Sequence, residues 1–123
     1  MGFNRRLDQD YRSMFDRVRE GKIGKVEMIR ITSRTFNFKS PKPKTVHFSG
    51  GMMREKGTHL FDLTTWISDA EPIEVYAAGS CLIDKNYKKF GEVDTASIII
   101  RLDNDALVNL EYSRRAYMVK MNG

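Results

Sequence analysis

The strongest constraint on the fold is an alternation of apolar and polar residues late in the sequence. Between positions 95 and 102, one face of the chain carries Ala96, Ile98, Ile100 and Leu102. Because successive side chains of a β-strand point to opposite faces, this spacing predicts a strand with one buried face. The pair Asn104 and Asp105 then predicts a turn, and residues 106–112 predict the strand that pairs back as a hairpin.

Two earlier stretches carry apolar residues at helical spacing instead. In residues 8–20 the stripe consists of Tyr11, Met14, Phe15 and Val18. In residues 52–67 it consists of Leu60, Leu63, Thr64 and Ile67, and Trp66 lies at its edge. Both stripes recur at i, i+3, i+4 and i+7, which predicts two amphipathic helices. Asp8 suits the N-cap of the first helix, and Pro72 excludes a continuation of the second.

The remaining segments complete the predicted fold. Residues 26–33 and 73–82 read as two further strands, and residues 34–51, with two prolines and two glycines, read as a long loop. The order of helix, strand, helix and three strands predicts an α+β fold, an open and mostly antiparallel sheet with two packing helices. At 123 residues the chain has the size of one domain, so we expect a single domain over residues 1–123.

Composition narrows the class of protein further. With 41% hydrophobic residues the chain is not of the disordered type. Its apolar runs are only a few residues long, so we expect no membrane partner. The single cysteine, Cys81, excludes an internal disulfide and a multi-cysteine zinc site. These features favour a reducing, cytoplasmic setting.

A candidate chemical site lies in residues 50–62. Glu55 and His59 are four residues apart, and Asp62 follows three residues later, so a helix would present all three on one face. A carboxylate beside an imidazole suits proton transfer near neutral pH. The spacing alone also fits an exposed charged helix face, and it leaves a metal site open, although our prediction contains no metal.

Basic residues suggest two further ligand classes. The stretch 34–44 combines Lys and Arg with Phe36 and Phe38, which fits either a nucleic-acid strand or a solvated loop. The net charge of +5 adds only weak support for a polyanion, so nucleic acid is the less favoured partner. Arginines at 5–6 and 114–115 fit a clamp for an anion or a hydroxyl-rich ligand, or simply solvated ends of the chain.

Five motifs occur in a fixed order, at 2–8 (GFNRRLD), 21–26 (GKIGKV), 32–34 (TSR), 50–62 (GGMMREKGTHLFD) and 113–117 (SRRAY). This order resembles the C-terminal domain of the glucose–fructose oxidoreductase family (Gfo/Idh/MocA), and within it the inositol 2-dehydrogenase-like branch. The resemblance extends from residue 2 to about residue 117.

The resemblance implies a substrate-binding and oligomerisation domain of an NAD(P)-dependent sugar or polyol dehydrogenase. Hydride would pass between a carbinol carbon and NAD or NADP, and the outer sheet face would form a homo-oligomer interface. It implies Glu55 and His59 as the catalytic pair, and Arg5 and Tyr117 as substrate-binding residues. His59 matches the family's histidine, whereas Glu55 stands where the family usually has Asp.

The sequence also departs from the family's full pattern. It contains no Gly-x-Gly-x-x-Gly turn, so the dinucleotide-binding domain is absent from these residues. We therefore expect a fragment that by itself holds no NAD or NADP and is inactive. Two alternatives have no catalysis: a standalone oligomerising scaffold and a basic nucleic-acid-binding module.

Overall fold

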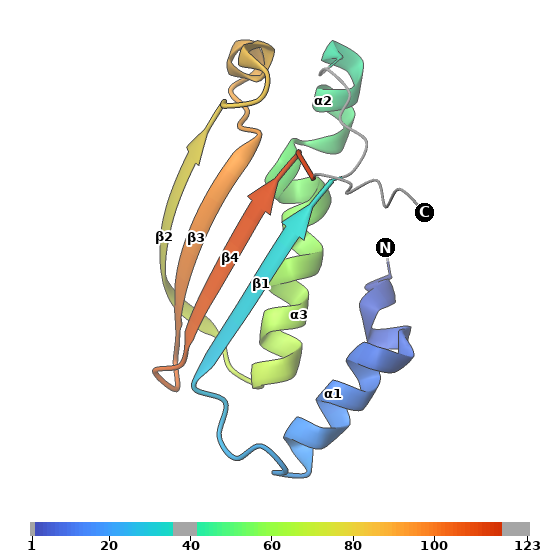
Figure 1. Cartoon of the computed structure of the whole chain (residues 1–123), viewed down its shortest axis with the longest axis vertical. Helices are drawn as coiled ribbons and strands as arrows, with labels where there is room; N and C mark the ends of the chain where they lie inside the picture. Colours follow the sequence, from blue (N-terminus) through green and yellow to red (C-terminus); the bar gives the residue numbers. More distant parts are fainter. Residues whose placement is uncertain (1, 36–41, 117–123) are drawn as a thin grey trace, which may run out of the picture.

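The computed structural model describes residues 2–35 and 42–116 (Figure 1). Its helices are the 3₁₀ turn η1 (Asn4–Leu7), α1 (Gln9–Arg19), α2 (Pro43–Ser49), the π-helical turn η2 (Met53–Gly57), α3 (Thr58–Ser68) and the 3₁₀ helix η3 (Lys85–Phe90). Its strands are β1 (Met28–Arg34), β2 (Pro72–Ser80), β3 (Thr95–Leu102) and β4 (Leu107–Ser113).

Within the described residues, four strands form one open sheet in the order β1-β4-β3-β2. The pairs β2–β3 and β3–β4 are antiparallel, and β1 pairs with β4 in parallel. Figure 1 shows the reason, because α3 returns the chain to the end of the sheet where β1 began. β2 therefore runs in the direction of β1, and after the antiparallel β3, β4 has that direction again. The predicted hairpin and the α+β class are confirmed, and the sheet is mixed at the β1 edge.

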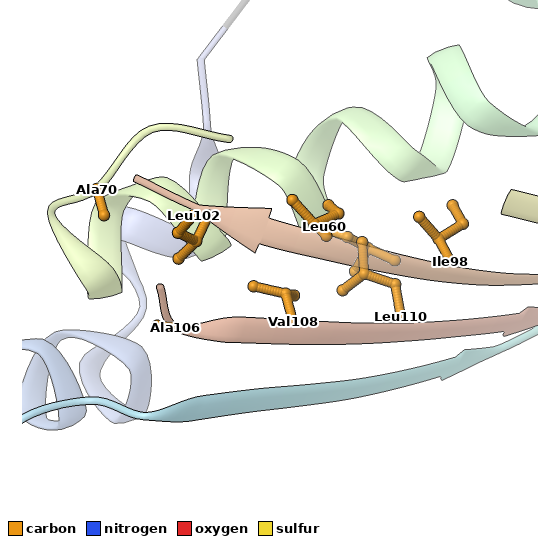
Figure 2. Packing of buried hydrophobic residues seen from close by; sticks show 8 residues of the cluster. Leu60, Ala70, Ile98, Leu102, Ala106, Val108 and Leu110 are labelled. Atoms are coloured by element: carbon orange, nitrogen blue, oxygen red, sulfur yellow. The ribbon is translucent and has the colours of Figure 1, made fainter. Parts of the chain in front are cut away.

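The core lies between α3 and one face of the sheet. The predicted stripe of α3 is buried, since Leu60, Leu63, Thr64 and Ile67 are each at most 5% exposed. Leu60 belongs to a buried cluster that also includes Ala70, Ile98, Ile100, Leu102, Ala106, Val108 and Leu110 (Figure 2). Burying a side chain of this size contributes roughly 1.5–3 kcal/mol. The apolar stripe of the helix and the alternating apolar residues of the strands thus pack against each other in one interface.

Helix α1 has a different attachment. The predicted N-cap is confirmed, because the Asp8 carboxylate accepts the backbone N–H groups of Asp10 and Tyr11 at 2.9 and 3.3 Å. No residue of α1 is buried, however. The helix instead contacts α3 through Phe15, whose ring stacks on Trp66 with 4.4 Å between centroids. α3 therefore covers the sheet, and α1 is held mainly by α3.

The prediction of a loop throughout residues 34–51 is wrong for residues 43–49, which form α2. Pro43 occupies the first turn of this helix, where proline loses no hydrogen bond. Gly50 ends the helix in the left-handed conformation, with φ of 70°. The same residue types that suggested a loop are therefore the start and stop signals of a short helix.

A buried carboxylate organises the connection from β2 to β3. Asp94 is fully buried, and its carboxylate accepts the backbone N–H groups of Leu82, Ile83 and Asp84 at 2.8–2.9 Å and the hydroxyl of Thr95 at 2.9 Å. Burial by itself raises the pKa of Asp94, but the N–H donors outweigh it and hold this pKa below its ordinary value. The ionised form is therefore favoured by folding.

We predict that Asp94→Asn lowers the free energy of unfolding by about 1–3 kcal/mol, because the amide loses the charge and turns a donor toward N–H groups. The lowered pKa means that the contribution of Asp94 is present above its unfolded pKa and is lost as the pH falls through its folded pKa. Urea unfolding at neutral and acidic pH measures both effects. Asp105→Asn is the control, because Asp105 is exposed in the β3–β4 turn. Equal unfolding energies for the two variants would contradict the prediction.

Candidate functional site

The predicted site residues that the structure describes lie in η1, in η2 and at the start of α3. Glu55 lies in the π-helical turn η2, and His59 lies in the first turn of α3. π-Helical turns inside helices are rare and are frequent at functional sites. The turn at Gly50 and Gly51 directly precedes this region, so the site begins where the chain leaves α2.

The Gly51 backbone is approached closely by Glu92. Gly51 has φ of 86°, and a Cβ atom built on it would lie 1.8 Å from Glu92 Oε1. The other carboxylate oxygen of Glu92 accepts the Met52 backbone N–H at 3.1 Å. Sequence reasoning missed Glu92, which is 40 positions from Met52. The absence of a side chain at Gly51 thus permits a contact between the β2–β3 connection and the start of the candidate site.

His59 has unused bonding capacity. Its side chain is partly buried, and its Nδ1 atom is buried with no hydrogen-bond partner in the described part of the chain. Its ring is roughly perpendicular to the ring of Phe3, with 6.3 Å between centroids and 87° between planes. A buried polar atom without a partner is costly, so an imidazole in this state favours a ligand that can bond with it.

Glu55 is not bonded to His59 in the described residues. Its carboxylate is 3.6 Å from Lys56 Nζ, and its side chain is 38% exposed. Glu55 and His59, the two members of the predicted pair, are close in the sequence, but no hydrogen bond joins them in the described structure. An exposed ion pair of this kind is worth about 0–1 kcal/mol, so it restrains Glu55 only weakly.

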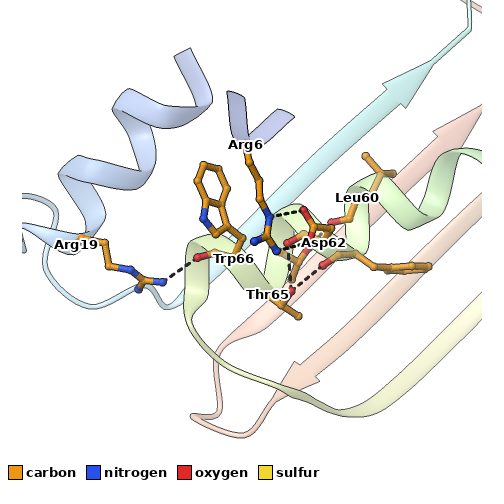
Figure 3. Close-up of polar contacts among 8 residues, drawn as sticks. Arg6, Arg19, Leu60, Asp62, Thr65 and Trp66 are labelled. Atoms are coloured by element: carbon orange, nitrogen blue, oxygen red, sulfur yellow. Dashed lines mark hydrogen bonds and ion pairs between the residues drawn. The ribbon is translucent and has the colours of Figure 1, made fainter. Parts of the chain in front are cut away.

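Asp62 is bound by an arginine, which sequence reasoning did not predict. Arg6 Nε donates to Asp62 Oδ2 at 3.0 Å, and Arg6 Nη2 donates to Oδ1 at 2.5 Å (Figure 3). The hydrogen bonds to Asp62 raise the pKa of Arg6 above its ordinary value. The neighbouring Arg5, the predicted substrate contact, is free of this ion pair, and its guanidinium lies 5.7 Å from the centre of the Tyr11 ring.

The structure tests several other predicted features only in part. Tyr117, Phe36 and Phe38 lie outside the described residues. Arg34, where the basic stretch begins, is exposed at the end of β1. Across residues 2–35 and 42–116, no cluster of three or more His, Cys, Asp or Glu is arranged to hold a metal ion. No helix in this part of the chain has the length and apolar character needed to cross a membrane.

The open sheet backed by α3 defines a class of domain, since it matches the C-terminal domain of inositol dehydrogenases. The family model described as the GFO/IDH/MocA C-terminal domain matches residues 11–121. The chain therefore belongs to the GFO/IDH/MocA family, and the resemblance drawn from the five motifs is confirmed.

Individual relatives agree with this assignment. The myo-inositol 2-dehydrogenase of Thermotoga maritima is 40% identical over 118 residues, which cover 94% of this chain and 34% of the relative. A crystal structure of a Thermotoga maritima protein has a TM-score of 0.85 at 39% identity, covering 94% of this chain and 34% of that one. The Lactobacillus casei scyllo-inositol dehydrogenase with bound NAD(H) and scyllo-inositol has a TM-score of 0.77 at 28% identity, covering 94% and 35%. The chain thus spans about a third of the length of these proteins.

We predict that Gly51→Ala destabilises the fold more than Gly24→Ala does. Both glycines have positive φ, which costs an L-residue about 1–2 kcal/mol, but an added Cβ meets nothing within 4 Å at Gly24. At Gly51 it would displace the Glu92 carboxylate and leave the Met52 N–H unpaired, which costs a further 1–3 kcal/mol or so. Urea unfolding of the two variants measures the difference. Equal losses would show that the Glu92 contact contributes nothing.

Proposed function

We propose that this domain is the substrate-binding part of an NAD(P)-dependent dehydrogenase that acts on inositol or a similar polyol. Family membership and the inositol dehydrogenases among the relatives support this proposal. The observation that carries it for this chain is His59, whose buried Nδ1 has no partner among the described residues and lies within the motif that the family resemblance assigns to catalysis.

The chemistry of alcohol oxidation explains why a histidine is needed. Hydride leaves a carbinol carbon only as the hydroxyl proton is removed, so a base must lie within hydrogen-bond reach of that hydroxyl. His59 can accept or relay this proton, because an imidazole exchanges protons near neutral pH. Glu55 would orient the ring and stabilise the imidazolium, as a carboxylate does beside other catalytic histidines. Its exposed pairing with Lys56 leaves it free to turn toward His59 at small cost.

Arg5 is the proposed contact for the substrate hydroxyls. A guanidinium presents five N–H donors in one plane, which suits two neighbouring hydroxyl groups of a polyol ring. Its neighbour Arg6 is bound to Asp62, so Arg5 is the member of the pair that remains available. The assignment of Tyr117 to the same pocket stays a prediction.

That the cofactor site lies outside these residues stays a prediction. It is supported by the sequence, which contains no Gly-x-Gly-x-x-Gly turn. When bound, a nicotinamide supplies the hydride acceptor, whereas the residues described above bind the polyol and handle its proton. That the chain alone holds no NAD or NADP and does not turn over stays a prediction, as does its cytoplasmic location.

We predict that His59→Gln lowers kcat for inositol oxidation by about 10²–10⁴-fold in the natural protein that contains these residues, because it removes the base. His47→Gln is the matched control, since His47 is the other histidine of the sequence and is exposed on α2. NAD(P)H production followed by absorbance measures the effect. Unchanged turnover of inositol in the His59 variant would contradict the proposed catalytic role and favour the scaffold alternative.

We further propose that a second copy of the chain covers the outer face of the sheet. On the opposite face, the alternate apolar residues of β3 and β4 are buried under α3, whereas Met28, Tyr76 and Ile99 are 61%, 62% and 45% exposed on the outer side. Large apolar side chains grouped on one exposed surface favour association. Ion pairs on the same face, Arg30 with Glu111 and Arg101 with Glu74, carry both signs of charge, which suits contact between identical surfaces.

We predict that Ile99→Asp converts the associated chain to monomers at micromolar concentration, because the substitution places a charge in the middle of that surface. Light scattering of the purified chain measures the mass. Ile23→Asp is the control, since Ile23 is 64% exposed in the connection between α1 and β1. A wild-type chain that is already monomeric at this concentration would overturn the proposal.

A further inference from the structure

The segment of residues 2–19 is tied to the rest of the fold by few contacts. No residue of η1 or α1 is buried, so the hydrophobic core does not hold this segment. In the described residues, it is attached to α3 and its C-cap by the ion pairs Arg6–Asp62 and Arg19–Asp69, by ring contacts and by a hydrogen bond that Arg19 donates to the Trp66 carbonyl at 2.9 Å (Figure 3). Each contact therefore has a large share in deciding where the segment lies.

The strongest of these contacts joins Arg6 to Asp62. Two parallel N–H···O bonds fix both the distance and the plane of the guanidinium, which is the geometry of the stronger charge-assisted pairs. The Asp62 side chain is only 9% exposed, although that of Arg6 is 44% exposed. The guanidinium also lies 5.7 Å from the ring centres of both Phe3 and Trp66. Arg6 is thus held from several sides.

Both partners of this ion pair are linked to His59, the candidate catalytic residue. On α3, Asp62 comes three residues after His59, which is about one helical turn. On the other segment, Phe3 contacts the Arg6 guanidinium and also packs in a T-shaped arrangement against the His59 ring. Arg5 directly precedes Arg6, and its carbonyl accepts the Asp8 N–H at 3.2 Å within the same turn. Fixing Arg6 therefore fixes the backbone from Phe3 to Asp8.

We propose that Asp62 and Arg6 are positioning residues: their ion pair sets the orientation of the His59 ring, through Phe3, and the placement of Arg5. Neither residue is proposed to touch the reacting atoms. The consequence for polyol binding rests on the proposed function, whereas the consequence for the His59 ring does not. The pair couples two segments that are 56 positions apart.

The first test is a nuclear magnetic resonance comparison of the 123-residue chain with Asp62→Asn. The chain has only two histidines, so His47 is an internal control for the His59 signals. We expect the His59 ring signals to shift and the Phe3–His59 proximity signal to disappear, with the His47 signals unchanged. Asp69→Asn is the matched control, because Asp69 is an exposed carboxylate at the end of α3 that pairs with Arg19 at 3.6 Å. If Asp62→Asn leaves the His59 signals and the proximity signal unchanged, the proposal is wrong.

Arg6→Lys is the second variant, and it keeps the charge but cannot form two bonds in one plane. We expect it to produce the same shift of the His59 signals, with an unchanged circular dichroism spectrum. A lysine variant that retains the wild-type His59 signals would show that charge alone suffices and would overturn the role of the paired geometry. Because two variants on different elements report on one ring, a folding defect in either one is recognised.

The second test measures myo-inositol oxidation by the natural protein that contains these residues. We expect Asp62→Asn to lower kcat/KM about 10²-fold, since a misplacement of about 1 Å at a catalytic group has an effect of that size. If His59→Gln abolishes turnover and Asp62→Asn does not change it, the positioning role is wrong and the proposed function stands. If no variant affects turnover, the proposed function fails, and the His59 signals alone decide whether the ion pair orients the ring.

Discussion

The packing of α3 onto the inner face of the β3–β4 hairpin is the interaction on which the rest of the structure depends. The apolar stripe of α3 and the alternate residues of the strands bury one another, and this contact fixes the rotation of the helix about its own axis. The same rotation decides where the polar residues of α3 point. His59 and Asp62 are therefore positioned by core residues that have no chemical role.

Different kinds of interaction stabilise the two sides of α3. The side toward the sheet is held by apolar burial, which resists change because a packed core leaves no room for adjustment. The side toward residues 2–19 is held by two ion pairs, a ring stack and a few hydrogen bonds. Partly exposed polar contacts of this type contribute less energy but specify direction.

The candidate site was only partly predictable from residue spacing. The positions of Glu55 and His59 at the start of a helix follow from the pattern, but the π-helical turn between them does not. Spacing also suggested that Asp62 belongs with His59, whereas the structure binds Asp62 to Arg6. Glu92 was not predicted to bind the Met52 backbone beside the turn at Gly51, because nothing local marks a contact across 40 positions.

The sequence by itself determined whether each main element is a helix or a strand. Helical and strand periodicities are properties of a few neighbouring residues, so the buried stripe of α3, the β3–β4 hairpin and the cap at Asp8 were all predictable. Tertiary structure alone decided which elements meet: the parallel pairing of β1 with β4, the loose attachment of α1 and the choice of Arg6 as the partner of Asp62. These depend on contacts between residues far apart in the chain, whose energies are settled only when the whole core has formed.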